Sequence, residues 1–127
     1  VGSASAAEID ANGILPATRT AVQRAIQNLA LMPEFLLMDY IHWPGLKNPH
    51  LMMPKGESRS LSVAAASVLA KTERDAVLIS LDERYAGYGF ARHKGYGTEA
   101  HRAAIQQIGY CPEHRRSYIL HSQIAQI

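Results

Sequence analysis

Two acidic residues each follow a short apolar run, a placement that favours metal chemistry. Asp39 closes the run 35–38, and Glu57 follows the run 51–53 after a tight turn. A carboxylate at the end of a buried strand is unfavourable unless it is paired, hydrogen-bonded or bound to a cation. Two such acids from neighbouring strands can converge on one point, and their oxygens suit Mg²⁺ or Mn²⁺ in phosphodiester cleavage. The alternative is that both acids cap helices or pair with arginines.

A second candidate is the segment 91–97, ARHKGYG, in which cations and an aromatic residue alternate within a predicted loop. Arg92 and Lys94 are suited to phosphate contacts, and Tyr96 is suited to stacking on a sugar or a base. A Gly-Tyr-Gly sequence is also a common turn, so a purely structural loop is the alternative.

Four residues in the C-terminal third raise the possibility of a zinc site: His93, His101, Cys111 and His114. The spacing Cys111-x-x-His114 is that of a ligand pair, but the spacing of the first two histidines matches no common zinc motif. The simpler interpretation is that these histidines lie on a basic surface, in water or against phosphate, and that Cys111 is structural. We read Glu73, Arg74 and Asp75 as an exposed charged stretch of a helix.

The composition predicts one globular domain over residues 1–127, with 47% apolar and 19% charged residues. No apolar run is long enough to span a membrane, no signal peptide is visible, and the single cysteine fits a reducing compartment, so we expect a cytoplasmic protein. Charge is uneven: residues 1–83 hold seven Lys/Arg against nine Asp/Glu, and residues 84–127 hold six against two. This asymmetry indicates either a polyanion partner or a solvated basic face.

Strands alternating with helices predict the α/β class. A short helix follows Ser5 and stops near Gly13, and a second helix begins near Pro16, presents an apolar stripe and ends before Pro33. The run 35–38 reads as a strand buried on both faces, and 51–53 reads as a second short strand. A helix capped by Thr98 is expected to end at Ile108, with 91–97 as a loop before it. Its inward-facing residues are predicted to be Ala100, Ala103, Ala104 and Ile108.

The segment 55–75 joins Glu57 to a helix that is expected to continue to about residue 85. Serines before and within its first turn are candidate caps, and small residues at 64–67 give a flat surface that allows close approach of a sheet or a polyanion. The periodicity predicts these core positions: Leu61, Ala65, Val68, Leu69, Thr72, Ala76 and Ile79.

Six segments together resemble the ribonuclease HII family, the type 2 ribonucleases H. They are, in order, AEIDANGI (7–14), ATRTAVQRAI (17–26), LLMD (36–39), KGESRSLSVAAASVLAKTERD (55–75), YGFARHKGYGT (88–98) and HRRSY (114–118). Any one segment would be a weak signal, but several in this order and spacing are specific, and they cover nearly the whole chain.

The resemblance implies a ribonuclease H-like fold, a central mixed sheet flanked by helices, and cleavage of the RNA strand in RNA–DNA hybrids. Single ribonucleotides embedded in duplex DNA are included, which implies a role in DNA replication and repair. It implies four acids that bind Mn²⁺ or Mg²⁺, with Asp39 as the third and Glu57 at a position where aspartate is usual. Metal-activated water would attack the phosphate 5′ to a ribonucleotide, leaving a 3′-hydroxyl and a 5′-phosphate. A monomer is expected.

The same resemblance assigns substrate contacts to three residues. Tyr96 matches a tyrosine that packs against the deoxyribose at the RNA–DNA junction, whereas Lys94 and Arg74 match phosphate contacts. The HRRSY segment is expected to support the fold and the basic face.

One family feature has no counterpart here: an Asp-Glu pair followed by a Gly-Arg-Gly loop that reads the ribose 2′-hydroxyl. The chain therefore reads as the C-terminal part of such an enzyme, without its N-terminal strands. Two alternatives follow for the chain alone. It is a non-catalytic module that binds RNA–DNA hybrids, or it does not fold by itself because a sheet edge and an apolar face are uncovered.

Overall fold

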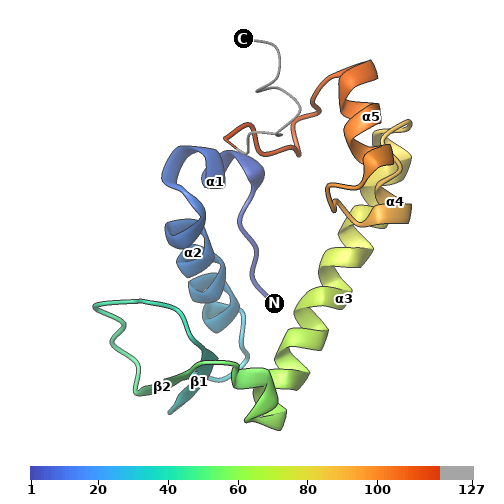
Figure 1. The fold of residues 1–127 in the computed structure, drawn as a ribbon. Coiled ribbons are helices and arrows are strands. Elements are labelled where there is room, and N and C mark those ends of the chain that lie inside the picture. The colour runs from blue at the N-terminus through green and yellow to red at the C-terminus, as the bar shows by residue number, and fades with distance from the viewer. Residues whose placement is uncertain (118–127) are drawn as a thin grey trace.

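The computed structural model describes residues 1–117, and it confirms the α/β class. A short parallel sheet lies at one end of a long helix, and two short helices lie at the other end (Figure 1). Its elements are α1 (Ala6–Asn12), α2 (Ile14–Gln27), β1 (Leu36–Asp39), β2 (His50–Met53), the 3₁₀ turn η1 (Gly56–Ser58), α3 (Leu61–Arg84), α4 (Phe90–His93) and α5 (Glu99–Ile108). Tyr118, the last residue of HRRSY, and His121 lie outside the described residues.

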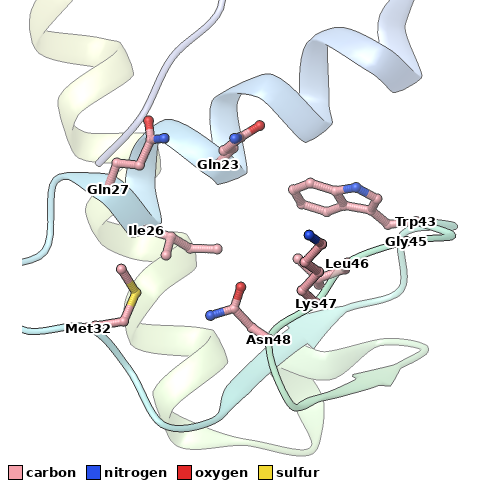
Figure 2. Close-up of a pocket in the computed structure, with 9 residues that line it drawn as sticks. All are labelled: Gln23, Ile26, Gln27, Met32, Trp43, Gly45, Leu46, Lys47 and Asn48. Atoms are coloured by element: carbon pink, nitrogen blue, oxygen red, sulfur yellow. The ribbon is translucent and has the colours of Figure 1, made fainter.

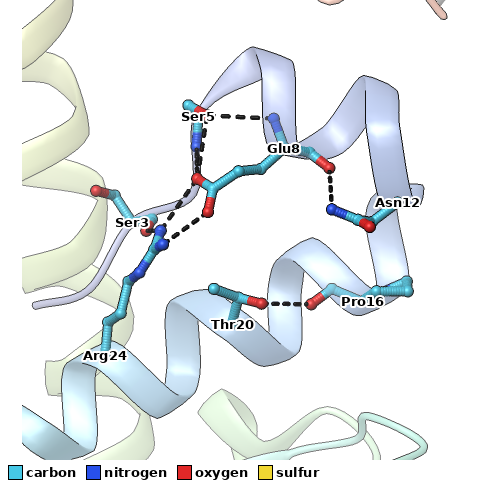
Figure 3. Close-up of polar contacts among 7 residues, drawn as sticks. All are labelled: Ser3, Ser5, Glu8, Asn12, Pro16, Thr20 and Arg24. Atoms are coloured by element: carbon cyan, nitrogen blue, oxygen red, sulfur yellow. Dashed lines mark hydrogen bonds and ion pairs between the residues drawn. The ribbon is translucent and has the colours of Figure 1, made fainter.

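The predicted first helix is confirmed as α1, which begins with the expected capping box. Ser5 Oγ accepts from the Glu8 backbone N–H, and the Glu8 carboxylate accepts from the Ser5 N–H. The Arg24 side chain of α2 pairs with Glu8 at 2.6 Å and also donates to the Ser3 carbonyl (Figure 3). Arg24 and Ser5 together lower the pKa of Glu8 to about 2. This network ties the N-terminal segment and α1 to α2.

The N-terminal segment lies directly against α2 because residue 2 has no side chain. A Cβ at Gly2 would lie 2.2 Å from the Ala21 carbonyl oxygen and 2.3 Å from the Ala25 nitrogen. Val22, Ala25 and Ile26, on the predicted stripe of α2, are half-buried, whereas Leu29 lies beyond the end of the helix and is exposed.

The two strands pair in parallel, with Leu36 opposite His50 and Asp39 opposite Met53. The prediction that the first strand is buried on both faces is wrong for the described chain. Leu36 and Met38 are half-buried, but the alternate residue Leu37 is 44% exposed. With two strands and few covering side chains, this sheet has one open face.

The long helix α3 begins at the predicted place, because Ser60 Oγ accepts from the Val63 N–H and caps it. Its predicted core stripe is wrong in this structure: every one of those seven residues is exposed, and Leu61 is 88% exposed. The buried residue of α3 is Val63, which meets Gly56. The spacing of the apolar residues identifies one face of α3, but no helix or strand within residues 1–117 covers that face.

The far end of α3 carries a compact core. Tyr88, Phe90, Ile105 and Cys111 are buried together, with Leu78 and Leu81 of α3 packed against them. The Tyr88 hydroxyl donates to the Gly109 carbonyl at 2.8 Å, and the rings of Tyr88 and Phe90 stack at 5.3 Å.

Two predictions fail in this core. The segment 91–97 is not all loop, because Phe90–His93 forms the short helix α4. The buried residues of α5 are His101 and Ile105, whereas Ala100, Ala103 and Ile108 are exposed and Ala104 is half-buried. The inward face is therefore rotated from the alanine stripe, because the His101 ring packs against Phe90 and His93 of α4.

The segment after α5 is attached to both halves of the chain. The Asp10 carboxylate in α1 accepts from the backbone N–H groups of Arg116 and Ser117 and from the Ser117 hydroxyl, contacts that lower the pKa of Asp10. This part of HRRSY therefore supports the fold, as predicted. No helix within residues 1–117 is both long enough and apolar enough to cross a membrane.

Candidate active site

Asp39 ends β1 and is held in its charged form by backbone donors. Its Oδ1 accepts from the Gly56 N–H at 3.1 Å and from the Tyr40 N–H at 2.8 Å. These bonds, with that of Gly56 the larger influence, lower the pKa of Asp39. Lys55 adopts a left-handed conformation, with φ of 55°, at the turn that presents the Gly56 N–H to this carboxylate. Asp39 is thus exposed and ionised, the state in which a carboxylate can bind a cation.

The close fit between Asp39 and the turn after β2 depends on Gly56. A Cβ at this position would lie 3.2 Å from Asp39 Cα, 3.2 Å from Val63 Cγ1 and 3.3 Å from Met53 Cγ. Glycine therefore lets η1 approach the end of β1, which brings the two predicted acids to the same end of the sheet.

Glu57 lies in η1 and faces α3. Its Oε2 accepts from the Ser67 hydroxyl at 3.4 Å and lies 3.8 Å from Lys71 Nζ. The carboxylate is exposed, so the lysine pairing is weak and leaves Glu57 able to exchange a partner for a cation. Within residues 1–117, no three His, Cys, Asp or Glu side chains are placed to share one metal ion.

The three predicted substrate contacts lie together at the middle of α3. Arg74 Nη2 donates to the Lys94 carbonyl at 2.7 Å, and the Arg74 guanidinium carbon lies 4.9 Å from the centre of the Tyr96 ring. Tyr96 is 64% exposed, so its ring is presented to solvent while the guanidinium lies against it. The Lys94 ammonium donates to the Ala91 carbonyl, which holds it close to its own loop.

One face of α3 links the acids to this loop. Ser67, Lys71 and Arg74 are spaced by four and three residues, so they lie on one side of the helix. The first two contact Glu57, and the third contacts Tyr96. Seven residues of helix separate the ends of this stripe by about 10 Å. Glu57, Arg74 and Tyr96 therefore lie along one side of α3, and Asp39 adjoins this side through its hydrogen bond to Gly56, the residue before Glu57.

Ser67 was singled out only as part of the flat surface 64–67, and Lys71 was not singled out at all. The available signal was their spacing from Arg74, because a helix that starts near Ser60 places all three on the side that meets Glu57.

The histidines do not form the considered zinc site. Cys111 Sγ lies 3.0 Å from His114 Nδ1, whereas His101 Nε2 lies 3.0 Å from His114 Nε2, on the other side of the same ring. No single ion can contact both neighbours of His114 in this arrangement. His93 and His101 are buried rather than on a solvated basic surface, so that interpretation is wrong for these two residues.

A separate open cavity of about 430 Å³ lies between α2 and the loop 43–48 (Figure 2). Trp43 and Lys47 line it from the loop, and Gln23 and Ile26 line it from the helix. None of the five predicted site residues contributes to its lining. The predicted chemistry therefore lies on an exposed surface and not in this cavity.

Comparison with known proteins places the chain in a family. The sequence matches the family model described as Ribonuclease HII over residues 1–121. Proteins named Ribonuclease HII from Psychromonas ingrahamii and Thermus thermophilus are each 48% identical over 118 residues, 93% of this chain and 58% of the relative. One from Mycobacterium ulcerans is 46% identical over 112 residues, 88% of this chain and 47% of the relative. The chain thus spans about half the length of these relatives, and by family match and identity it belongs to the ribonuclease HII family.

Proposed function

We propose that the protein containing this chain is an endoribonuclease that cleaves the RNA strand of RNA–DNA hybrids, including single ribonucleotides embedded in duplex DNA. The observation that carries the proposal is the common surface formed by Asp39, Glu57, Arg74 and Tyr96. It combines anionic oxygens for metal ions with a cation and an exposed ring for a nucleic-acid strand.

The two acids fit Mg²⁺ or Mn²⁺. Both present carboxylate oxygens at an exposed position, and the lowered pKa of Asp39 keeps that ligand charged at neutral pH. When bound, such ions supply an activated water and stabilise the charge that develops on the phosphate. Two carboxylates are half of the set expected for the family, so the remaining ligands belong to the part of the longer relatives that this chain does not span.

The chain's own residues would position the strand. Tyr96 offers an apolar ring face to a sugar, and Arg74 and Lys94 place positive charge beside it for the flanking phosphates. Recognition at Tyr96 would therefore fix which phosphate reaches Asp39 and Glu57.

Cleavage would leave a 3′-hydroxyl and a 5′-phosphate at a ribonucleotide. The test is incubation of the full-length protein with a duplex that contains one ribonucleotide, with Mn²⁺ or Mg²⁺ present, and analysis of the product ends. Nicking 5′ to the ribonucleotide is expected, and an all-DNA duplex is the matched control. Failure to nick the first duplex with either metal, or equal nicking of both duplexes, would reject the proposal.

A second candidate function, non-catalytic binding of hybrids, applies to residues 1–127 taken alone. It is favoured by the presence of the Arg74–Lys94–Tyr96 group without a complete carboxylate set in the described residues. Binding that weakens with salt and leaves the hybrid intact would support it. Cleavage by the isolated chain would exclude it.

A further inference from the structure

A chain of hydrogen bonds through the buried His101 and the half-buried His114 ends on the loop that carries Tyr96. His101 Nδ1 lies 3.0 Å from the Tyr96 carbonyl, and His101 Nε2 faces His114 Nε2 at 3.0 Å. His114 Nδ1 faces the Cys111 N–H at 3.1 Å and the Cys111 thiol at 3.0 Å. His101 is only 6% exposed, so water does not compete for these contacts.

The Tyr96 carbonyl and the Cys111 N–H lie at the two ends of this chain of hydrogen bonds. They determine which ring nitrogen of His101 and of His114 carries the proton. A carbonyl accepts only, so His101 must carry its proton on Nδ1, and its Nε2 is then an acceptor. His114 must donate to it from Nε2, which leaves His114 Nδ1 free to accept from the Cys111 N–H. One neutral tautomer of each histidine satisfies every contact, and the alternative tautomers place two donors or two acceptors face to face.

His93 fixes Gly95 of the same loop, because both of its ring nitrogens have backbone partners. Its Nε2 donates to the Tyr88 carbonyl at 2.8 Å, so its Nδ1 accepts from the Gly95 N–H at 3.2 Å. The rings of His93 and His101 stack at 4.2 Å with an interplanar angle of 17°. The Gly95 N–H and the Tyr96 carbonyl are therefore anchored to two stacked, buried rings.

The backbone of this loop is held while the Tyr96 ring stays exposed. The Tyr96 carbonyl also accepts from the Thr98 N–H at 2.8 Å, and Arg102 donates to the Gly97 carbonyl at 2.9 Å. The rings of His93 and His101 also pack edge-on against Phe90, at 6.0 and 5.6 Å, so an apolar ring could supply that packing but not the hydrogen bonds. The histidine ring nitrogens match the polar groups of the loop.

We propose that His93 and His101 are positioning residues that hold the loop 94–98 so that Tyr96 meets the substrate, with His114 setting the tautomer of His101. The inference deepens the proposed function, on which the role of Tyr96 rests. Its structural part, the hydrogen-bonded tautomers and the order of the loop, is measurable without substrate.

The decisive comparison is between two variants of one residue. The side-chain amide of His101→Asn can occupy the place of Nδ1 and still donate to the Tyr96 carbonyl, whereas that of His101→Gln reaches the place of Nε2 and faces His114 instead. Both remove the imidazole, so a merely structural role lowers the melting temperature of the two alike. Positioning of Tyr96 predicts that His101→Gln raises KM about three- to tenfold, with little change in kcat, and that His101→Asn has a KM close to that of the wild type.

Two measurements on the full-length protein complete the test. Nitrogen-15 NMR of the imidazoles is expected to show Nδ1–H for His101 and Nε2–H for His93 and His114. Amide exchange in the loop 94–98 is expected to accelerate in His101→Gln and not in His101→Asn. Equal KM and equal exchange in the two variants, or a different tautomer of His101, would overturn the inference. If the wild type does not cleave the ribonucleotide duplex, the proposed function fails, and the NMR and exchange results still decide whether His101 positions the loop.

Discussion

The two ends of α3 differ in how completely this chain builds them. At the histidine end, Tyr88, Phe90, Ile105 and Cys111 are buried together, and the buried imidazoles have polar partners. At the acid end, Asp39 and Glu57 stand on a two-stranded sheet whose Leu37 and Leu51 are exposed. This chain builds the core at the histidine end completely, because all the residues of that core and their histidine partners lie within residues 78–114. At the acid end, residues 1–117 leave apolar side chains of the sheet uncovered.

The largest expected effect separates chemistry from folding at the acid end. Asp39→Asn keeps an oxygen that can accept from the Gly56 and Tyr40 N–H groups but removes the charge that binds a cation. Cleavage by the full-length protein should fall by about a thousandfold or more, since a metal contributes several kcal/mol to the transition state.

The melting temperature of Asp39→Asn should stay near that of the wild type, and single-turnover cleavage is the measurement. Retained turnover would remove Asp39 from the metal site. A large fall in melting temperature would mean that the acid end depends on this charge for folding.

A second prediction compares backbone packing at the two ends. Gly56→Ala places a Cβ within 3.2 Å of Asp39 Cα and Val63 Cγ1, so it should lower the free energy of unfolding by about 1–3 kcal/mol through overpacking. Gly97→Ala is the matched control at the histidine end, because a Cβ there meets nothing within 4 Å and the residue does not have positive φ. Urea unfolding of both variants is the measurement, and equal midpoints would show that η1 does not need this close approach.

The third prediction concerns the exposed ring at the loop. Tyr96→Ala should raise KM for a ribonucleotide-containing duplex about tenfold, as loss of stacking on one aromatic residue costs about 1–3 kcal/mol. The ring is 64% exposed, so thermal stability should change little. Tyr96→Phe keeps the stacking face and should behave nearly as the wild type. An unchanged KM in Tyr96→Ala would separate the loop from substrate binding.

The smallest effect is a pH dependence that belongs to the histidine end. Burial is the main cause that lowers the pKa of His101 and of His114, and each is also disfavoured in its charged form by neighbouring histidines. The unfolded chain therefore binds more protons than the folded chain just below the ordinary histidine pKa of 6.5. The contribution of these two neutral histidines to the free energy of unfolding is complete above pH 6.5 and is lost as the pH falls through their lowered pKa values.

Thermal unfolding between pH 7.5 and 5 measures this loss, in a window above the ordinary pKa values of Asp, 3.8, and Glu, 4.5. The titratable groups that face the two rings are His93, Tyr88, Tyr110 and Cys111, and the Tyr96 carbonyl and the Phe90 ring complete their surroundings. His101→Gln should flatten the dependence, whereas His42→Gln, an exposed position, should not. The same slope in both variants would assign the effect to other groups.

Sequence reasoning was most successful where the determining contacts are local. Ser5 and Thr98 were recognised as caps, and Ser60 was one of three candidate serines for α3, because a cap and its helix lie within a few residues; the helix starts are confirmed. The faces of α3 and α5 were wrong, because periodicity marks an apolar side without showing which neighbour is present. His101 is the clearest case: its burial depends on the Tyr96 carbonyl and on His114, thirteen residues away. The pairing of Asp39 with Gly56 depends likewise on strand register, which no local pattern gives.

The helical stripe of Ser67, Lys71 and Arg74 also limits how this protein can change in length. One residue inserted between Ser67 and Arg74 would turn the rest of α3 by about 100° and shift it by about 1.5 Å. Arg74 and the Tyr96 loop, which packs beside Leu78 on the later part of α3, would then turn away from the side of the helix that carries Ser67 and Glu57, although no residue had been substituted. Insertions in the loop 40–49 leave this spacing unaltered, because that loop lies before α3 in the chain. The site thus tolerates substitutions in α3 better than insertions or deletions, because the helix sets the distance and the angle between the residues at its two ends.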